Sequence, residues 1–431
     1  MINTDIAIGL LLGGFFILLL LKVPVTFALL VSSGITAIYL NLGLMPIVQQ
    51  MCAGVNKTNL LAIPFFIMAG EIMGSGGISQ RLIKFSHALV GWMPGGLAQV
   101  NVLASMFFGG ISGSAVADTS SLGAVLIPMM KDEGYDAEFA VGITCTSSCQ
   151  GILIPPSHNM IMYSVCAGSL VSVSDMFLAG LFPGVCLGIS LMVTSFILAI
   201  KRNYPKGRPM TGKERLTSAI KALPSLGTIV IIVVGVAFGL FTATESAAVA
   251  CIYAFLLTFI FIREIKLPAM IGILDRCLRT LALVLSLIAA ANAFAWLMTF
   301  LKIPKMITTA MMSVSDNKYV VYALILILLL LLGCIMDMAP LILIMSPILI
   351  PVAMHYGMDP THFGIVLIFA LAIGLCTPPV GSVLFVGCSI GKTKIETTAW
   401  KMMPMFLTMV FMLVLVTYIP WFTSFLPNLF K

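Results

Sequence analysis

Residues 109–128 read GGISGSAVADTSSLGAVLIP, and residues 145–159 read CTSSCQGILIPPSHN. The first stretch places Ser112-Gly113-Ser114 between two apolar arms, and the second interrupts an apolar helix between Gly151 and Pro156. Lipid offers no hydrogen-bond partner to a free backbone group, so such a turn or break persists in a membrane only where protein or a water-filled cavity surrounds it. We therefore predict a re-entrant hairpin over 97–130 and a broken helix over 138–170.

The same arrangement returns 223 positions later without a gap. Gly151 corresponds to Gly374, and Pro155-Pro156 corresponds to Pro378-Pro379. Glycine and proline set where a backbone turns or breaks, so these matches indicate one structural unit used twice. Inverted repeats are common in secondary transporters, where the substrate site lies at the repeat interface. The second copy predicts two further elements, a hairpin over 319–353 and a broken helix over 361–391.

The composition is that of a polytopic membrane protein. Of 431 residues, 60% are hydrophobic and only 9% are charged, whereas a soluble domain carries about 25% charged residues. A helix needs roughly 20 apolar residues to cross a bilayer, and apolar segments of about that length fill most of the chain. We expect an all-α polytopic membrane protein with two inverted repeats, each with a re-entrant hairpin and a broken helix, which excludes soluble and β-barrel folds.

Charge and cysteine usage exclude several function classes. The net charge of +7 comes from short loops, so it does not indicate nucleic-acid binding. Seven Lys and Arg residues lie between 201 and 221, which positive-inside bias assigns to the cytoplasm. The ten cysteines form no CxxC pair and are expected to be buried thiols. No Walker motif is present, so we expect neither direct ATP driving nor any cofactor.

These features divide the chain into six expected segments. They are N-terminal scaffold helices (1–60), repeat 1 with its hairpin and broken helix (61–175), a span with a basic cytoplasmic linker (176–222), scaffold and arm helices (223–280), repeat 2 with its hairpin and broken helix (281–399), and a C-terminal span (400–431).

Each hairpin tip and each break leaves backbone groups unpaired at mid-membrane depth. Free carbonyls suit Na⁺, and helix amide ends suit an anion. Ser114 and Asp337 occupy the same repeat position, which favours a shared role in coordinating an ion. The alternative is that the small residues only permit close helix packing. The oxygen-bearing candidates in the first half are Ser112, Ser114, Asp118, Ser147 and Asn159, with the carbonyls near Gly151, and in the second half Asp337, Thr377 and Ser382, with the carbonyls near Gly374.

Four carboxylates, on Glu71, Asp118, Glu245 and Asp337, lie in apolar surroundings. Intramembrane acids are costly and indicate function by default, although a helix cap is an alternative. Asp118 in particular is a candidate N-cap for the returning arm. Segments 95–130, 138–200 and 331–391 contain no Lys or Arg. An anionic substrate bound there would depend on Na⁺ and helix N-termini, which is a physical route to symport.

Two other functions compete with a transporter. Residues 110–113 match the GxSG motif of rhomboid-type intramembrane proteases, with Ser112 as nucleophile and His158 as a candidate base. The second repeat has Ile335 and Gly381 at those positions, which argues against catalysis, so we expect no enzyme. A passive channel would need pore-lining charge rings, and none is evident.

The chain resembles the large membrane subunit of tripartite ATP-independent periplasmic (TRAP) transporters, and the resemblance runs over nearly its whole length. The motifs that carry it are IPFFIMAGEIM (63–73), SGSAVADTSSLGAVLIPMM (112–130), GILIPPS (151–157), FTATESAAVA (241–250), MDMAPLILIMSPILIP (336–351) and GLCTPPVGSVLF (374–385).

The resemblance implies an elevator-type, Na⁺-coupled transporter in the bacterial inner membrane. Carried onto this sequence, it implies Na⁺ contacts at Ser112, Gly113, Ser114 and Gly151 in the first half, and at Asp337, Met338, Gly374 and Thr377 in the second. It also implies three partners besides the lipid bilayer: a small four-helix membrane subunit, a soluble periplasmic binding protein, and an organic acid substrate. A standalone Na⁺/carboxylate symporter, which needs no binding protein, remains the alternative.

The run Pro155-Pro156-Ser157-His158-Asn159 resembles members that transport sialic acid, so sialic acid is the favoured substrate, with C4-dicarboxylates and other sugar acids open. Two positions depart from the family pattern: Ala243 replaces a proline, and Ala339 replaces a threonine. The substrate contacts expected in the cavity are Ser147, Pro155, Pro156, His158, Asn159, Pro378, Pro379 and Ser382.

Overall fold

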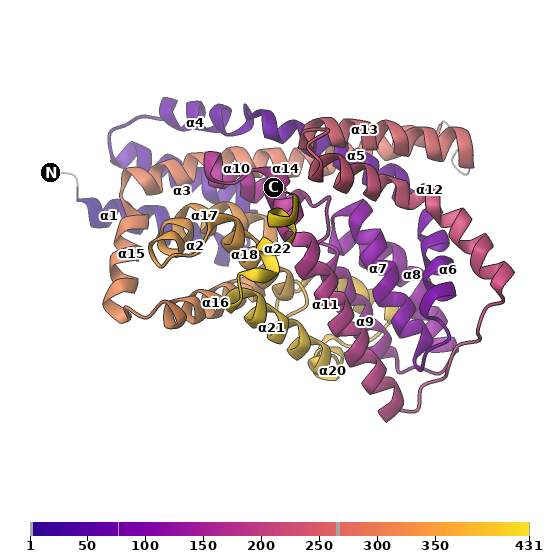
Figure 1. Cartoon of the computed structure of the whole chain (residues 1–431). Helices are drawn as coiled ribbons and strands as arrows, with labels where there is room; N and C mark the ends of the chain where they lie inside the picture. The colour runs from indigo at the N-terminus through magenta and orange to yellow at the C-terminus, as the bar shows by residue number, and fades with distance from the viewer. Residues whose placement is uncertain (1–2, 76, 264–267, 431) are drawn as a thin grey trace.

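The computed structural model describes residues 3–75, 77–263 and 268–430 (Figure 1). Across these residues the chain is helical and contains no β-strand, apart from an isolated bridge between Pro94 and Lys206. Seven of the described helices are long and apolar enough to cross a bilayer, or eight if a bent pair near the C-terminus counts as one span. The prediction of an all-α polytopic membrane protein is confirmed.

The first hairpin consists of α7 (Gly96–Ser112) and α8 (Ala115–Asp132). Gly113 ends α7 with φ +61°, a left-handed conformation that glycine adopts without a Cβ clash. Ser114 is the N-cap of α8, and its hydroxyl accepts a hydrogen bond from a backbone N–H three residues later. Asp118 lies inside the first turn of α8, so the prediction that it caps this helix is wrong.

The broken helix and its second copy have matching boundaries. The first is α9 (Ala137–Gln150) and α10 (His158–Ala167), with a cis peptide bond at Pro155-Pro156 between them. A second cis bond, at Pro378-Pro379, lies in the second copy. Every helix of the unit recurs 223 positions later to within one residue. The second set is α16 (Lys318–Ile335), α17 (Met338–His355), α18 (Pro360–Gly374) and α19 (Ser382–Gly391).

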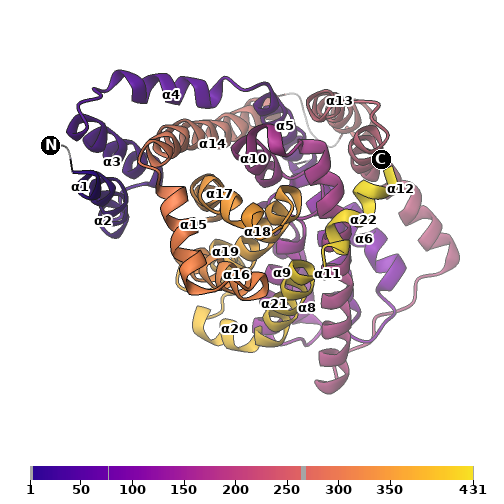
Figure 2. The same ribbon diagram turned by 60° about the vertical axis from the view of Figure 1, so that its left-hand side comes forward.

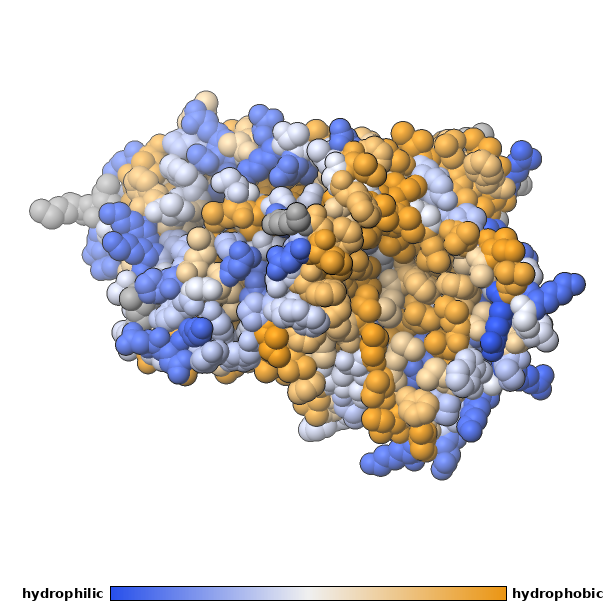
Figure 3. All heavy atoms as spheres, viewed as in Figure 1, coloured by the Kyte–Doolittle hydropathy of each residue, from blue (hydrophilic) through white to orange (hydrophobic). Residues whose placement is uncertain are grey.

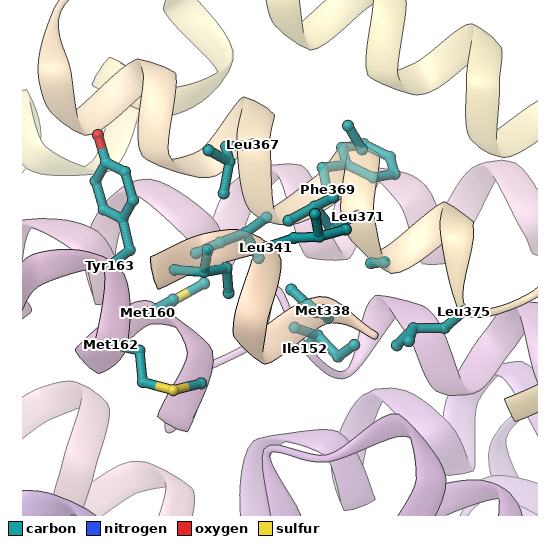
Figure 4. Close-up of a cluster of buried hydrophobic side chains, with 14 of the residues drawn as sticks. Ile152, Met160, Met162, Tyr163, Met338, Leu341, Leu367, Phe369, Leu371 and Leu375 are labelled. Atoms are coloured by element: carbon teal, nitrogen blue, oxygen red, sulfur yellow. The ribbon is translucent and has the colours of Figure 1, made fainter. Parts of the chain in front are cut away.

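The two copies exchange the second parts of their broken helices. Helix α10 packs against α17 and α18 of the other copy, and α19 packs against α8 and α9. Figure 4 shows this contact at Met160 and Tyr163 of α10, which face the apolar side chains of α17 and α18. The Tyr163 hydroxyl donates to the carbonyl of Pro360 at 2.6 Å. We call α7–α10 together with α16–α19 the hairpin body.

The remaining helices surround the hairpin body. Along one edge of the molecule α4 packs against α14, α14 against α5, and α5 against α13, and we call these four the frame helices (Figures 1 and 2). The bounds from the N-terminus are α1 (Thr4–Ile8), η1 (Gly9–Gly13), α2 (Gly14–Leu20), α3 (Val25–Tyr39), α4 (Met45–Val55), η2 (Thr58–Leu61), α5 (Ala62–Ser75), α6 (Ile78–Val90) and η3 (Gly168–Leu170). Those that follow are α11 (Val173–Lys201), α12 (Gly212–Ala237), α13 (Ala243–Phe255), η4 (Leu256–Ile262), α14 (Ala269–Phe300), α15 (Ile303–Val314), α20 (Ile395–Lys401), α21 (Met403–Tyr418) and α22 (Trp421–Phe430).

Three boundaries differ from those expected from the sequence. The expected boundary between residues 280 and 281 falls inside one continuous helix, α14, because no proline interrupts it. The basic linker becomes helical from Gly212, where Thr211 and Glu214 form a capping box. The last span bends by 60° between α20 and α21, and Pro404 lies in the first turn after the bend.

The outer surface carries an apolar band suited to lipid. In Figure 3 this band covers α11 and α12, and hydrophilic residues border it at the lower end of α11 and the outer end of α12. Helix α11 illustrates the band, since the large hydrophobic side chains exposed along it are all aliphatic: Ile189, Val193, Ile197 and Ile200. Such a surface matches a helix that faces hydrocarbon. All ten cysteines are free thiols, but the expectation that they are buried holds for only five of them: Cys145, Cys149, Cys277, Cys376 and Cys388. Cys52 is exposed, and the other four are partly buried.

Candidate functional site

The first hairpin tip, Ser112–Ser114, lies directly against the first break, residues 151–157. A Cβ built on Gly151 would lie 2.7 Å from the Cα of Gly109, so the two backbones touch. A Cβ on Gly113 would collide with the Pro156 carbonyl oxygen. Contacts this close need glycine, because any side chain would separate the helices.

The second hairpin tip, Met336-Asp337, lies against the second break, residues 375–381. A Cβ on Gly374 would lie 2.6 Å from the carbonyl group of Gly333. The backbone N–H of Val380 donates to the Cys334 carbonyl at 3.1 Å and ties the break to the hairpin.

Side-chain oxygens gather at the second tip as well. The Ser382 hydroxyl donates to Asp337 at 3.4 Å, and the Thr377 hydroxyl donates to the Gly374 carbonyl at 2.9 Å. Asp337 is the N-cap residue of α17, yet its carboxylate makes no capping hydrogen bond. The carboxylate oxygens therefore accept no hydrogen bond from the first amides of α17 and are available to other partners, such as the Ser382 hydroxyl. Carboxylate oxygens are ligands that a hard cation prefers.

The residues predicted to bind Na⁺ thus fall into two groups. Ser112, Gly113 and Ser114 form the first tip, and Gly151 lies against Gly109, one turn before that tip. Asp337 and Met338 begin α17 at the second tip, whereas Gly374 and Thr377 lie at the second break, where Gly374 contacts Gly333. Each group combines a helix end with an interrupted helix, which is the arrangement that ion sites in transporters use.

A cavity of about 550 Å³ opens beside the first tip. Its walls come from the first hairpin, from α10, and from the frame helices α5 and α14. This volume lies within the roughly 300–1,000 Å³ of small-molecule sites. The polar groups that line it are the side chains of Glu71, Ser75, Ser112, Ser114, Ser120, Ser121, His158, Arg276 and Thr280.

Arg276 provides a positive charge in this cavity. Its Nε donates to Glu71 at 2.9 Å, and its terminal nitrogen donates to the Ser75 hydroxyl at 2.9 Å. Half of the Arg276 side chain remains exposed. Segments 95–130, 138–200 and 331–391 contain no Lys or Arg, but Arg276 of the frame helix α14 places a fixed cation in the wall of this cavity.

The predicted substrate contacts lie in several places. His158 lines the cavity, whereas Asn159, Pro155 and Pro156 are buried in and next to the first break. Ser147 is fully buried between α7 and α9, where it donates to Asn101. The described lining of this cavity includes no residue of the second repeat, so Pro378, Pro379 and Ser382 lie outside it.

Sequence reasoning missed Arg276 as a site residue. Arg276 and Glu71 are 205 positions apart, and Arg276 sits in an amphipathic stretch where a solvated charge is the ordinary expectation. The intramembrane position of Glu71 was the available signal, since such an acid requires a partner.

Comparison with known proteins identifies the family of the chain. Residues 12–422 match the model of the DctM component of tripartite ATP-independent periplasmic transporters. The chain is 42% identical over 423 residues to the uncharacterized protein YgiK of Salmonella typhimurium, covering 97% of each chain. It is 37% identical to the sialic acid TRAP transporter large permease SiaM of Vibrio cholerae, covering 89% of each. It is 36% identical to the 2,3-diketo-L-gulonate TRAP transporter large permease YiaN of Escherichia coli, covering 96% of each.

The fold resembles that of a solved transporter. The YdaH transporter of Alcanivorax borkumensis superposes with a TM-score of 0.64 over 89% of each chain at 14% identity. At this identity the likeness concerns the fold alone.

Proposed function

Because the chain belongs to the family of the DctM component of tripartite ATP-independent periplasmic transporters, we propose that it imports an organic acid in symport with Na⁺. The family consists of large transporter permeases for organic acids and not of enzymes. The GxSG motif at 110–113 is therefore part of a transporter hairpin, and the intramembrane protease hypothesis is wrong.

Arg276 is the observation that carries the proposal of an anionic substrate. It faces the Ser112–Ser114 tip across the cavity and pairs with Glu71. Guanidinium binds carboxylates through paired hydrogen bonds. A substrate carboxylate would take the place of Glu71 at Arg276, while the N-terminal amides of α8 and α10 supply further positive potential.

The two tip-and-break groups support Na⁺ coupling. Both offer serine, threonine or aspartate oxygens next to interrupted helices. Na⁺ bound at the first tip would add positive charge beside the cavity, so the anion and the cation would each strengthen the binding of the other. Thermodynamic linkage makes this strengthening reciprocal.

The exchange of α10 and α19 supports an elevator movement. It joins both hairpins and both broken helices into one packed unit, which would slide as a body against the frame helices. The cavity lies at this boundary, so sliding would change the distance between Arg276 and a substrate held by the first tip.

The proposal includes three partners, namely a small membrane subunit, a periplasmic binding protein and an organic acid substrate, and a place in the bacterial inner membrane. A small four-helix membrane subunit would cover apolar surface of the frame, and a periplasmic binding protein would deliver the organic acid substrate. The multi-pass chain would lie in the bacterial inner membrane with the basic residues between 201 and 221 on the cytoplasmic side.

Sialic acid is the first substrate to test. The relatives' named substrates are sialic acid, 2,3-diketo-L-gulonate and C4-dicarboxylates, all of which carry a carboxylate. The run Pro155-Pro156-Ser157-His158-Asn159 favours sialic acid among them, with His158 at the cavity wall.

Uptake into proteoliposomes tests this proposal. The vesicles contain this chain with its small subunit, and labelled sialic acid, 2,3-diketo-L-gulonate or succinate is added with and without a Na⁺ gradient and the binding protein. Uptake of one acid that requires both the Na⁺ gradient and the binding protein is the expected result. Uptake without the binding protein would indicate a standalone symporter, and uptake independent of Na⁺ would overturn the coupling.

A further inference from the structure

Asp118 is a fully buried carboxylate in the first turn of α8. The hydroxyl side chains of Ser105 on α7 and Ser148 on α9 lie beside it. Neither of its oxygens has a hydrogen-bond partner of regular geometry among the described residues. Buried carboxylates are normally paired or bound to a cation, because loss of hydration is costly.

The surroundings of Asp118 are polar on three helices. Ser105 and Ser147 hydroxyls lie 3.2 Å apart, and Ser147 donates to the Asn101 side-chain oxygen at 3.2 Å. Asn101 in turn donates to the Thr144 hydroxyl at 2.6 Å. All of these side chains are fully buried. We call Asn101, Ser105, Asp118, Thr144, Ser147 and Ser148 the polar cluster.

The second repeat shows that the fold does not require this cluster. Residues 223 positions later, at the matching places on α17 and α18, are all apolar and buried: Leu341 for Asp118, Leu367 for Thr144, Ala370 for Ser147 and Leu371 for Ser148. Figure 4 shows Leu341, Leu367 and Leu371 packed among other apolar side chains. Leu324 and Leu328 of α16, which match Asn101 and Ser105, are also apolar but are exposed. The contact between α17 and α18 is thus formed by hydrocarbon at the matching places, so packing of this helix pair does not require polar side chains.

No basic side chain on the elements that form the cluster is placed to neutralise Asp118. Helices α7 and α9 contain no Lys or Arg. The basic residue of α8, Lys131, lies in its last turn and donates to the Gly391 carbonyl at 3.2 Å. The N-terminus of α8 contributes roughly half a positive charge, which offsets only part of the carboxylate charge.

We propose that the polar cluster binds a Na⁺ ion through the Asp118 carboxylate and the hydroxyls of Ser105 and Ser148. This site lies one helical turn beyond the first tip and adjoins the first break, where the Gly151 N–H donates to the Ser148 carbonyl at 3.2 Å. None of its three proposed ligands belongs to either tip-and-break group. The inference rests on the proposed Na⁺ coupling. The carboxylate and hydroxyl oxygens are the ligands that a hard cation prefers, and the ion supplies the charge that the helices lack.

Direct binding of ²²Na⁺ tests the inference. The chain is purified with its small subunit into lipid nanodiscs, and bound ²²Na⁺ per chain is measured across NaCl concentrations at constant ionic strength. Wild type is compared with Asp118→Asn, Ser148→Ala, and Asp118→Leu, which installs the residue of the second repeat. We expect one fewer ion bound in both Asp118 variants, and an at least tenfold higher half-saturating concentration for one ion in Ser148→Ala.

Two controls distinguish loss of the proposed ion site from misfolding of a variant and from failure of the proposed Na⁺ coupling. Thermal unfolding without Na⁺ shows whether each variant is folded, and Asp118→Leu is expected to remain folded because the second repeat tolerates leucine there. If folded Asp118→Asn binds as many Na⁺ ions as wild type, with the same affinity, the inference is overturned. Asp118 would then be a protonated carboxyl group that binds no ion. If Asp337→Asn then lost an ion, the proposed coupling would still stand; no ²²Na⁺ binding by wild type would overturn both.

Discussion

Gly109 and Gly151 touch backbone to backbone, with 2.7 Å between the Gly109 Cα and the position of a Cβ on Gly151. This contact sets how closely the first hairpin lies against the first break. The ion and substrate groups at the tip depend on it, because a wider spacing would separate the tip oxygens from the break.

Gly151→Ala is expected to destabilise the protein by about 1–3 kcal/mol, as overpacking does, and to lower uptake strongly. Thermal unfolding and uptake measure the two effects. Gly13→Ala is the matched control, because no atom lies within 4 Å of its added methyl group. Equal stability and uptake in both variants would show that the close contact is dispensable.

Gly374→Ala is expected to act in the same way in the second repeat. Its Cβ would lie 2.6 Å from the Gly333 carbonyl group, which cannot move without bending α16. The Na⁺ concentration that gives half-maximal uptake should rise, since Thr377 and Asp337 would shift apart. An unchanged Na⁺ titration would remove this contact from the ion site.

Arg276→Ala is expected to reduce uptake at low substrate concentration by at least about tenfold, because a charge-assisted hydrogen bond to the substrate contributes about 1.5–3 kcal/mol. Stability should change by less than about 1 kcal/mol, since the Arg276–Glu71 pair is partly exposed to solvent.

Arg279→Ala is the control for this prediction. Arg279 lies on the same helix and pairs with Asp275 at its surface, with 77% of its side chain exposed. Uptake should remain near wild type. Similar losses in both variants would mean that the general charge of α14, and not the cavity, matters for uptake.

Thr242→Ala is expected to cost about 1 kcal/mol of stability through loss of a helix cap. Thr242 and Glu245 form a reciprocal capping box at the start of α13. Thermal unfolding checks it, with Thr244→Ala as the comparison because Thr244 is not the cap. Glu245 therefore has a structural role that explains its position without substrate binding, and equal melting temperatures would contradict this assignment.

Thiol labelling is expected to distinguish Cys52 from the buried cysteines. Cys52 is exposed on α4, whereas Cys149 and Cys376 lie buried with their sulfur atoms 3.2 Å apart. A hydrophilic maleimide should label Cys52 within minutes in the native protein and Cys149 only after denaturation. Because four other cysteines are partly exposed, the control is a variant that keeps Cys149 as its single cysteine. Rapid labelling of this variant in the native state would show that the core is open.

The repeat was predictable because glycine and proline mark backbone turns independently of tertiary context. The Ser112–Ser114 tip and both proline breaks were found from that signal, and their helix boundaries agree within a few residues. Partners across the fold were not predictable. Arg276 meets Glu71 only because α14 passes beside α5, and no local period encodes that contact.

Asp118 shows why the surroundings of a buried side chain could not be predicted from local sequence patterns. A polar residue near a helix start indicates a cap, yet Ser114 takes that role and leaves the carboxylate buried. Only the packing of α7 and α9 against α8 shows what surrounds it.

The exchange of α10 and α19 has a consequence for biosynthesis. When the ribosome has completed the first half, the apolar face of α10 has nothing to cover it, because α17 and α18 are still to be made. Until the second half is synthesised, the first half therefore lies in the membrane with this apolar face uncovered. Other membrane segments could bind to that face and cause misfolding. Two genes that encoded the halves separately would have to deliver their products to the same place at the same time, which a single continuous chain guarantees.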